Sequence, residues 1–473
     1  MKYPTAHIEY NMEVYIYLVL FVLYSNVLCD DIIVNTNVGR IQGIQKNITV
    51  DGQVKTSSWF YGVPFAETTA GNNRFQKPIA KAAFLETFEA NQSPTACYQV
   101  SDEDYGNFSH GNYSEDCLNL NIYVPNDLTD QHLLPVMIWI YGGGFTDGTA
   151  AIYPATGLSS FGNVVVVTIN YRIGMFGFLQ SSDGTLVGNQ GLWDQHLAIK
   201  WVHNNIAAFS GNPDEVTIFG ESAGGASVLY QAIYPGNQGL FKRVIAESGS
   251  PLGYWAFQEP NAEQYIDYTK CTKQVLSNVD CLLSLSPREL QVERELISNE
   301  TLKFVPTLDG DFLKGTPHDI ILGNNTFFAS ERAFFASLDI VIGFNNYDGF
   351  DFTLSNTDEA KKLYADPFRM TKDLFDNMVS YYINSFEPTQ LASDREMLRR
   401  LIDFTYTDWT KPDDMDTLRE SMINIASDLD MFAPSIAVAD THAMLGGGMT
   451  YVYIFSANPS TRFYEMPKWF NGK

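Results

Sequence analysis

The chain has 473 residues, of which 45% are apolar and 18% charged, a globular balance that excludes a disordered or fibrous protein. Acidic residues outnumber basic residues by 55 to 30, and the net charge of −25 leaves no basic surface for nucleic acid. A chain of this length can bury a core large enough to fold without a metal or disulfide scaffold.

An unbroken apolar run, Val14–Tyr24, lies near the N-terminus. It is shorter than the about 20 residues that span a bilayer, and it is typical of the apolar region of a secretory signal peptide. Val27 and Cys29 occupy the −3 and −1 positions of a cleavage site before Asp30. We therefore predict a signal peptide over residues 1–29 and a secreted protein, with a buried strand or a membrane anchor as the alternatives. No later segment is expected to be a membrane anchor.

The cysteine and asparagine patterns agree with export. Cleavage leaves the four cysteines Cys97, Cys117, Cys271 and Cys281. An even count in an exported chain indicates two disulfides with three possible connectivities, of which the sequence-local pairing is the simplest; free buried thiols are the alternative. N-glycosylation sequons occur at Asn47, Asn91, Asn107, Asn112, Asn299 and Asn324. We expect glycans on several of them.

Strands alternate with helices along the chain. The continuous apolar runs Val136–Tyr141 and Val164–Asn170 predict parallel strands buried on both faces. Gln195–Ala208 has the spacing of an amphipathic helix. Further strands are predicted at Val216–Phe219, Arg243–Ala246, Leu338–Ile342 and Thr450–Phe455. This alternation predicts an α/β fold with a large, mostly parallel central sheet and helices on both faces.

Two polar, helical stretches interrupt this alternation, at Gln258–Glu300 and Asp358–Asp430. Neither is flanked by a low-complexity linker or by an internal repeat. We therefore interpret both as insertions that lie over the sheet, and residues 30–473 as a single domain.

A candidate nucleophile follows the strand at Val216–Phe219. The sequence Gly220-Glu221-Ser222-Ala223-Gly224 fits the pattern G-x-S-x-G between a strand and a helix, as a nucleophile elbow requires. The small glycines permit a strained serine backbone, and the helix N-terminus favours a developing negative charge. An ordinary Gly/Ser turn is the alternative.

Three consecutive glycines, Gly142-Gly143-Gly144, follow the strand that ends at Tyr141. Their backbone N–H groups are not shielded by side chains, so the loop can stabilise the oxyanion of a tetrahedral intermediate together with the N–H of Ala223. A flexible surface turn is the alternative.

A nucleophilic serine needs a base, and the base needs an orienting carboxylate that comes later in the chain. Asp348 follows the strand at Leu338–Ile342 and precedes a glycine, which makes it the natural candidate. Asp351 is its local rival, and a solvated loop carboxylate is the alternative.

These motifs together resemble the type-B carboxylesterases, the family that includes the cholinesterases, within the α/β-hydrolase fold. Ser114–Ile122 is similar to one signature of that family, and the stretch from Gly188 through Ser222 is similar to another. Phe60–Ala66 and Ser248–Pro251 also match. The similarity extends from about Val34 to the end of the sequence.

The resemblance implies roles for individual residues. Ser222 would be the nucleophile, Asp348 the triad acid in place of the more usual Glu, and Gly143, Gly144 and Ala223 the oxyanion hole. It also implies that Cys97 pairs with Cys117 and Cys271 with Cys281. Trp255 would line the acyl pocket, and Glu221 would lie beside the nucleophile. Cholinesterases carry a cation-binding tryptophan at the position of Asn107, so a choline specialist is not expected.

The expected histidine does not follow the strand Thr450–Phe455. The seven histidines are His7, His110, His132, His196, His203, His318 and His442. His442 is late in the chain, but it precedes the last strand and so belongs to the edge of the sheet opposite the nucleophile. His196 and His203 share a helix face, where packing is a simpler interpretation than a metal pair.

The sequence therefore predicts a secreted serine esterase that cleaves carboxylic esters and needs no cofactor and no metal. It further predicts that the chain stops before its catalytic histidine and is inactive and poorly soluble as written. A non-catalytic extracellular binding protein on the same fold is the alternative. The expected partner is a small-molecule ester, with neither nucleic acid nor a membrane anchor.

Overall fold

The structure is a computed structural model that describes residues 31–50, 52–99, 113–126, 132–260, 262–273, 277–290, 304–350, 370–386 and 392–457. Some sequence-based expectations fall outside these residues. They are the signal peptide, the histidines His7 and His110, the sequons Asn107, Asn112 and Asn299, and the rival acid Asp351.

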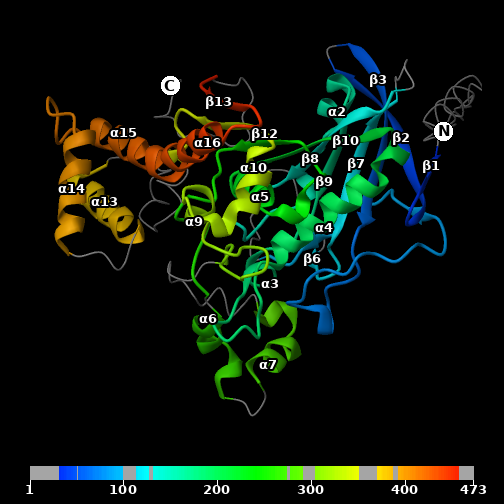
Figure 1. The fold of residues 1–473 in the computed structure, drawn as a ribbon, viewed down its shortest axis with the longest axis horizontal. Coiled ribbons are helices and arrows are strands. Elements are labelled where there is room, and N and C mark those ends of the chain that lie inside the picture. The colour runs from blue at the N-terminus through cyan, green and yellow to red at the C-terminus, as the bar shows by residue number, and fades with distance from the viewer. Residues whose placement is uncertain are drawn as a thin grey trace, which may run out of the picture.

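One large sheet forms the centre of the molecule (Figure 1). Its strands are β1 Asp31–Thr36, β2 Gly39–Val50, β3 Gln53–Pro64, β4 Phe88–Glu89, β7 Asn119–Pro125, β8 Leu134–Ile140, β9 Val165–Ile169, β10 Gly211–Glu221, β11 Arg243–Glu247, β12 Asp339–Asn345 and β13 Thr450–Phe455. Their order is β1-β2-β3-β7-β9-β8-β10-β11-β12-β13, with β4 beside β2. A separate pair joins β5 Ala96–Cys97 to β6 Tyr113–Ser114.

The sheet is mixed, with two regions of different direction. From β9 through β8, β10, β11 and β12 to β13 every neighbouring pair is parallel, as the apolar runs predicted. From β1 to β9 the pairs are antiparallel. The sequence analysis did not foresee the antiparallel strands at the N-terminal side. β2 and β3 carry polar residues over much of their length, so they lack the continuous apolar runs of the buried parallel strands.

Helices flank this sheet. They are α2 Thr156–Gly162, α3 Gly174–Phe178, α4 Gln190–Asn205, α5 Ala223–Ala232, α6 Ala262–Tyr268, α7 Asn278–Ser284, α9 Pro317–Ile321, α10 Ala329–Ala336, α13 Lys372–Phe386, α14 Ala392–Tyr406, α15 Met415–Ala426 and α16 Ala433–Leu445. The helix predicted at Gln195–Ala208 begins earlier, as α4, and ends in the 3₁₀ turn η3 Ile206–Phe209. The helix α5 packs on β8, β10 and β11, whereas α2 packs on β3, β7 and β9.

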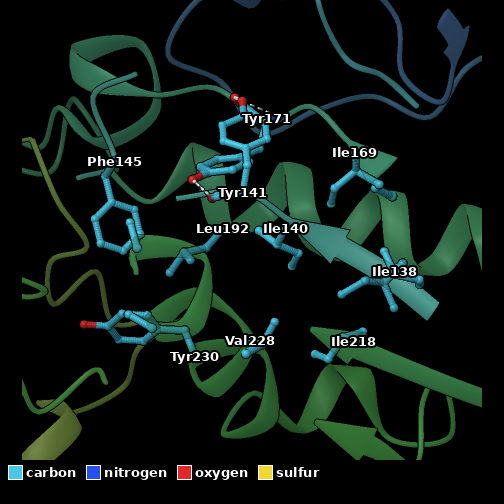
Figure 2. Packing of buried hydrophobic residues seen from close by; sticks show 14 of the residues in the cluster. Ile138, Ile140, Tyr141, Phe145, Ile169, Tyr171, Leu192, Ile218, Val228 and Tyr230 are labelled. Carbon is cyan, nitrogen blue, oxygen red and sulfur yellow. Dashed lines mark hydrogen bonds between the residues drawn. The ribbon is translucent and has the colours of Figure 1, made fainter. Parts of the chain in front are cut away.

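The hydrophobic core lies between the central strands and these helices. Ile138 and Ile140 of β8 and Ile218 of β10 are fully buried against Leu192 of α4 and Val228 of α5 (Figure 2). The transfer of apolar surface out of water, worth roughly 25 cal/mol per Å², holds the helices on the sheet. The carboxyl ends of β8 and β10 are thereby fixed relative to each other.

The described part of the stretch Asp358–Asp430, residues 370–386 and 392–430, does not lie over the sheet, contrary to the expectation. Its described helices α13, α14 and α15 lie to one side of the strands (Figure 1). They form a second hydrophobic cluster that includes Phe375, Val379 and Met422. The expectation was wrong because the apolar faces of these helices pack chiefly on one another. We call α13, α14 and α15 the helical lobe.

The helical lobe continues through the π-helical turn η8 Ser427–Phe432 into α16, which returns to β12 and β13. This continuous run, Met415–Leu445, is long and apolar enough to cross a membrane by length and composition alone. The sequence analysis had expected no such segment. Of its most apolar window, 61% is buried inside the structure, as in the core helix of a globular domain.

The structure contains two disulfides, in the pairing that the family resemblance implied. Cys97 pairs with Cys117 at a Cα–Cα distance of 4.9 Å, and Cys271 pairs with Cys281 at 5.5 Å. Both distances lie in the usual range for disulfides. All four cysteines are buried, so neither bond is exposed to solvent reductants.

Candidate active site

Ser222 lies in a sharp turn between β10 and α5. Its backbone angles are φ 55° and ψ −121°, a conformation that a residue with a side chain rarely adopts. The Ser222 N–H donates to the carbonyl of Glu247 on β11 at 2.9 Å, and the Ser222 carbonyl accepts from Ala226 N–H at 2.9 Å. These bonds hold the turn in its strained form, as a nucleophile elbow requires.

The glycines of the turn are needed for close backbone contact. A Cβ atom on Gly220 would lie 2.5 Å from the carbonyl oxygen of Ile140 and 2.6 Å from the carbonyl carbon of Gly224. A Cβ atom on Gly224 would collide with the backbone of Ile140. Only glycine therefore lets the nucleophile turn lie directly against the end of β8.

The glycine loop that follows β8, which we expect to be the oxyanion loop, lies beside Ser222. A Cβ atom on Gly142 would be 2.6 Å from the carbonyl oxygen of Glu221 and 3.0 Å from the Cβ of Ser222, so the loop lies directly against the turn. Gly143 and Gly144 have φ values of 101° and 60°, which turn the chain back on itself. The Gly143 carbonyl accepts from Thr146 N–H at 2.9 Å and from Asp147 N–H at 3.1 Å. The loop can therefore present N–H groups to a carbonyl oxygen bound at Ser222.

Phe145 fixes the middle of this loop. It has a left-handed backbone with φ 62°, its side chain is fully buried, and its carbonyl accepts from Gly174 N–H at 2.6 Å. Its ring packs at 5.2 Å from that of Phe178 and at 6.5 Å from that of Trp255. The buried Trp255 donates its indole N–H to the Asp430 carbonyl at 3.2 Å. Trp255 thus packs near the ring of Phe145 in the glycine loop, and its role in an acyl pocket stays a prediction.

Asp348 follows β12, two strands along the sheet from the nucleophile strand. Its Oδ2 accepts from the Ser248 hydroxyl at 2.7 Å and from the Asn345 N–H at 2.9 Å, and its Oδ1 accepts from Asn345 Nδ2 at 2.6 Å. Burial raises the pKa of Asp348, while the Ser248 and Asn345 hydrogen bonds oppose the rise. The carboxylate is therefore held in one orientation, as an acid that orients a base must be.

Ser248 is a site residue whose contact the sequence analysis missed. It directly follows β11, the strand between β10 and β12, and its N–H donates to the Gly343 carbonyl at 2.7 Å. Position alone could have signalled it, because a polar residue at the carboxyl end of the intervening strand must face the same edge. Glu221 is exposed beside Ser222, and its Oε2 would lie 3.0 Å from a Cβ atom on Gly142.

His442 lies at the opposite edge of the sheet. Its ring is buried, with Nδ1 2.7 Å from Thr450 Oγ1 and Nε2 3.1 Å from the Phe335 carbonyl. Thr450 begins β13, which runs parallel to β12 and hence to β10, whereas Ser222 follows the end of β10. Burial lowers the pKa of His442. His442 therefore lies where the sequence predicted it, at the edge of the sheet opposite the end of β10.

The other described histidines also have places away from the nucleophile. His196 Nδ1 lies 2.7 Å from Asn237 Oδ1, and His203 lies further along the same helix α4. Within the described ranges, no histidine side chain hydrogen-bonds to Ser222 or Asp348. The same ranges hold no cluster of three or more His, Cys, Asp and Glu suited to a metal ion.

Comparison with known proteins identifies a single family. A model described as the carboxylesterase family matches residues 30–473. Bile salt-activated lipase of Bos taurus is 34% identical over 461 residues, which cover 92% of this chain and 71% of the lipase. Cholinesterase of Mus musculus is 31% identical over 479 residues, 95% of this chain and 75% of the cholinesterase. Neuroligin-2 of Mus musculus is 30% identical over 482 residues, 92% of this chain and 54% of the neuroligin.

Proposed function

Because the chain belongs to the carboxylesterase family, which has the α/β-hydrolase fold, we propose that it hydrolyses carboxylic esters through an acyl-serine intermediate on Ser222. The strained backbone of Ser222, in contact with the glycine loop, is the observation that best supports this activity. A turn that only connects a strand to a helix has no need of a strained serine.

The proposed reaction begins when Ser222 Oγ attacks the ester carbonyl and a base takes the hydroxyl proton. The carbonyl oxygen becomes an oxyanion, which accepts hydrogen bonds from the N–H groups of Gly143, Gly144 and Ala223. Collapse of this intermediate releases the alcohol, which receives the proton from the base. Water then attacks the acyl-serine by the same steps in reverse and releases the acid.

We infer that Asp348, held by Ser248, orients the imidazole that acts as this base. None of the five described histidines is placed to serve, and His442 least of all, because both of its nitrogens are engaged at the far edge of the sheet. Mutation of His442 to Ala is therefore expected to affect folding and not the pH dependence of ester turnover.

A non-catalytic binding protein is the second candidate function. It is favoured by the absence, within the described ranges, of a histidine beside Ser222, and by the similarity to neuroligin-2. In that case the elbow would be only a structural turn, and Ser222 would react with electrophiles no faster than an ordinary serine.

The first prediction distinguishes these candidates by the reactivity of Ser222. Where the catalytic base is supplied, we expect a fluorophosphonate probe to modify Ser222, and Ser222→Ala to abolish the modification while leaving the thermal unfolding midpoint within a few degrees. Peptide mass spectrometry identifies the site. Ser330→Ala is the control, since Ser330 lies on α10 and its hydroxyl bonds to Glu331, outside the proposed machinery. Labelling that persists in Ser222→Ala would contradict the esterase proposal.

The second prediction concerns substrate class. Glu221 is the acidic group beside the nucleophile, but the sequence has Asn107 where the cation-binding tryptophan of cholinesterases is expected. We propose that uncharged aryl esters of short or medium acyl chains are preferred to choline esters. The ratio of kcat/KM for phenyl acetate and acetylcholine decides this, and a large preference for acetylcholine would overturn it.

We also propose that the protein enters the secretory pathway. The two buried disulfides are typical of an oxidising compartment. The three described sequon asparagines, Asn47, Asn91 and Asn324, are all exposed, which glycosylation requires. Their side chains lie on the surface whether or not the apolar N-terminal segment is cleaved.

A further inference from the structure

Two buried tyrosines next to the oxyanion loop bond to each other's backbone. The Tyr141 hydroxyl donates to the Tyr171 carbonyl at 3.1 Å and accepts from the Tyr171 N–H at 3.4 Å. In return, the Tyr171 hydroxyl donates to the Tyr141 carbonyl at 2.8 Å. The rings stack with centroids 4.6 Å apart and planes 25° apart (Figure 2). We call this pair the tyrosine clasp.

The clasp has no contact with solvent. Both side chains have 0% relative exposure, and burial raises the pKa of both phenols, so the hydroxyls remain protonated donors. A buried carbonyl or N–H that loses its partner is costly. The clasp therefore ties the chain after β8 to the chain after β9 by bonds that water cannot replace.

Tyr141 contacts both ends of the oxyanion loop. It directly precedes Gly142, and a Cβ atom on Gly148, where the loop ends, would lie 2.7 Å from Tyr141 Cε2. Gln99 holds the same end by donating to the Gly148 carbonyl at 2.9 Å and accepting from the Gly148 N–H at 2.9 Å. A Cβ atom on Gly224 would lie 2.9 Å from the carbonyl carbon of Tyr141. Any shift of Tyr141 is therefore transmitted to the nucleophile turn as well.

We propose that the tyrosine clasp sets the position of the oxyanion N–H groups of Gly143 and Gly144 relative to Ser222. This inference rests on the esterase function proposed above. We treat Tyr141 and Tyr171 as positioning residues, because neither hydroxyl faces Ser222. Each hydroxyl instead donates a hydrogen bond to the backbone carbonyl of the other tyrosine.

The inference specifies how the clasp would fail. Tyr171→Phe keeps the ring stack but leaves the Tyr141 carbonyl without its donor. The end of β8 then relaxes, and the oxyanion donors move from the distance at which they stabilise a transition state. A loss confined to the transition state lowers kcat and leaves KM nearly unchanged. We expect kcat to fall about tenfold, less than the 10²–10³-fold loss on removal of an oxyanion donor itself.

Tyr265→Phe is the matched control. Tyr265 is likewise fully buried, and its hydroxyl lies 2.8 Å from the Leu290 carbonyl, the same distance as in the clasp, and 3.0 Å from Met175 Sδ. It lies on α6, away from β8 and β10 (Figure 1). Its loss should lower stability without a selective effect on kcat.

The experiment compares wild type, Tyr171→Phe, Tyr141→Phe, the double variant and Tyr265→Phe. Amide hydrogen exchange of the peptide spanning residues 142–148 reports on the loop whether or not the protein turns over esters. We expect that peptide to exchange about tenfold faster in each clasp variant and unchanged in Tyr265→Phe. Aryl ester kinetics then test the kcat effect, which should not be additive in the double variant.

The outcomes separate the two proposals. Unchanged exchange over residues 142–148 in Tyr171→Phe, or an equal change in Tyr265→Phe, would overturn the clasp. Faster exchange with kcat and KM both unchanged would overturn its positioning role. A wild-type protein without turnover or Ser222 labelling would overturn the esterase proposal, while the exchange data would still decide whether the clasp holds the loop.

Discussion

Glu247 shows how a single buried group near the nucleophile affects stability. Its backbone carbonyl accepts from Ser222 N–H, and its half-buried carboxyl group lies at the end of β11. Burial raises the pKa of this carboxyl above its ordinary 4.5. The folded protein therefore holds the proton more tightly than the unfolded chain does. The stabilisation that results is present below pH 4.5 and is lost as the pH rises through the raised pKa.

The third prediction follows from this loss of stability as the pH rises. Glu247→Gln removes the titration, so the free energy of unfolding of the variant should rise relative to wild type between about pH 4 and about pH 7. Urea unfolding at the two pH values measures it. Glu263→Gln is the control with the opposite sign, because hydrogen bonds from Ser182 lower the pKa of Glu263. If the free energy of unfolding of Glu247→Gln falls relative to that of wild type between about pH 4 and about pH 7, the raised pKa of Glu247 is contradicted.

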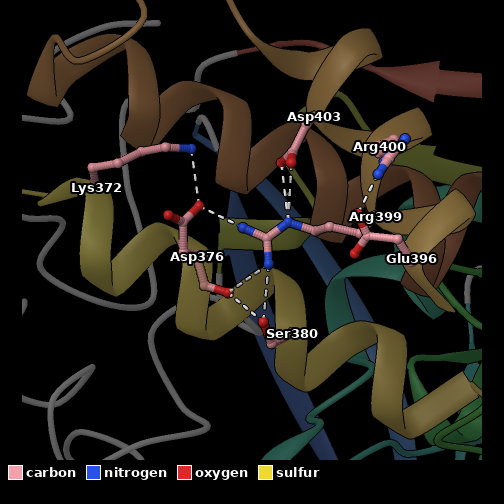
Figure 3. Close-up of polar contacts among 7 residues, drawn as sticks. All are labelled: Lys372, Asp376, Ser380, Glu396, Arg399, Arg400 and Asp403. Atoms are coloured by element: carbon pink, nitrogen blue, oxygen red, sulfur yellow. Dashed lines mark hydrogen bonds and ion pairs between the residues drawn. The ribbon is translucent and has the colours of Figure 1, made fainter. Parts of the chain in front are cut away.

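At the scale of elements, Arg399 joins two helices of the helical lobe (Figure 3). From α14 it donates to the carboxylate of Asp376 on α13 at 2.6 Å and to the hydroxyl of Ser380 at 3.0 Å. It also pairs with Asp403 one turn along its own helix at 3.1 Å. The side chain is 23% exposed, so solvent screens these bonds only in part. Arg400 is 78% exposed and pairs only locally, with Glu396.

The fourth prediction compares these neighbouring arginines. Arg399→Ala should destabilise the packing of α13 on α14 by about 1 kcal/mol, because it removes the link between α14 and Asp376 and leaves Asp376 paired with Lys372 of its own helix. Arg400→Ala removes the same charge and should cost no more than about 0.5 kcal/mol. Native-state hydrogen exchange of α13 and α14 measures both, since the lobe has its own hydrophobic cluster. Equal losses in the two variants would show that net charge, not the bridge, matters.

At the scale of the whole molecule, the exposed strand β13 is the surface that we expect to affect self-association. Among the described strands it ends the sheet, and its side chains are exposed although nearly all are apolar: Val452 is 46% exposed and Ile454 59%. An exposed apolar edge strand is a template for pairing with another chain. The net charge of −25 opposes self-association only at long range and at low salt.

The fifth prediction is that a charge on this edge raises solubility. Val452→Lys should increase the concentration at which the protein remains monodisperse, because an edge lysine disfavours strand pairing. Val54→Lys is the control: Val54 is more exposed, at 61%, but lies in the β2–β3 hairpin. Light scattering against concentration compares the variants. If both lysines act equally, the added charge is responsible and the edge is not.

The sequence by itself determined what depends on neighbouring residues. The elbow at Ser222, the glycine loop and the parallel strands at β8, β9 and β10 could be predicted, because turn chemistry and continuous apolar runs are local signals. The family resemblance, and with it the pairing of the cysteines, was likewise present in the motifs. The catalytic roles of Ser222, Asp348 and the oxyanion glycines remain predictions.

Only the tertiary structure decided which distant groups meet. Ser248 and Asp348 are 100 residues apart, and Tyr141 and Tyr171 are 30 apart; strand order and register bring each pair together. The helical lobe and the antiparallel strands β1–β3 were missed for a related reason. Amphipathic patterns reveal that a face is buried but not against what, because burial of apolar surface is not directional, whereas hydrogen bonds between particular atoms require the folded geometry.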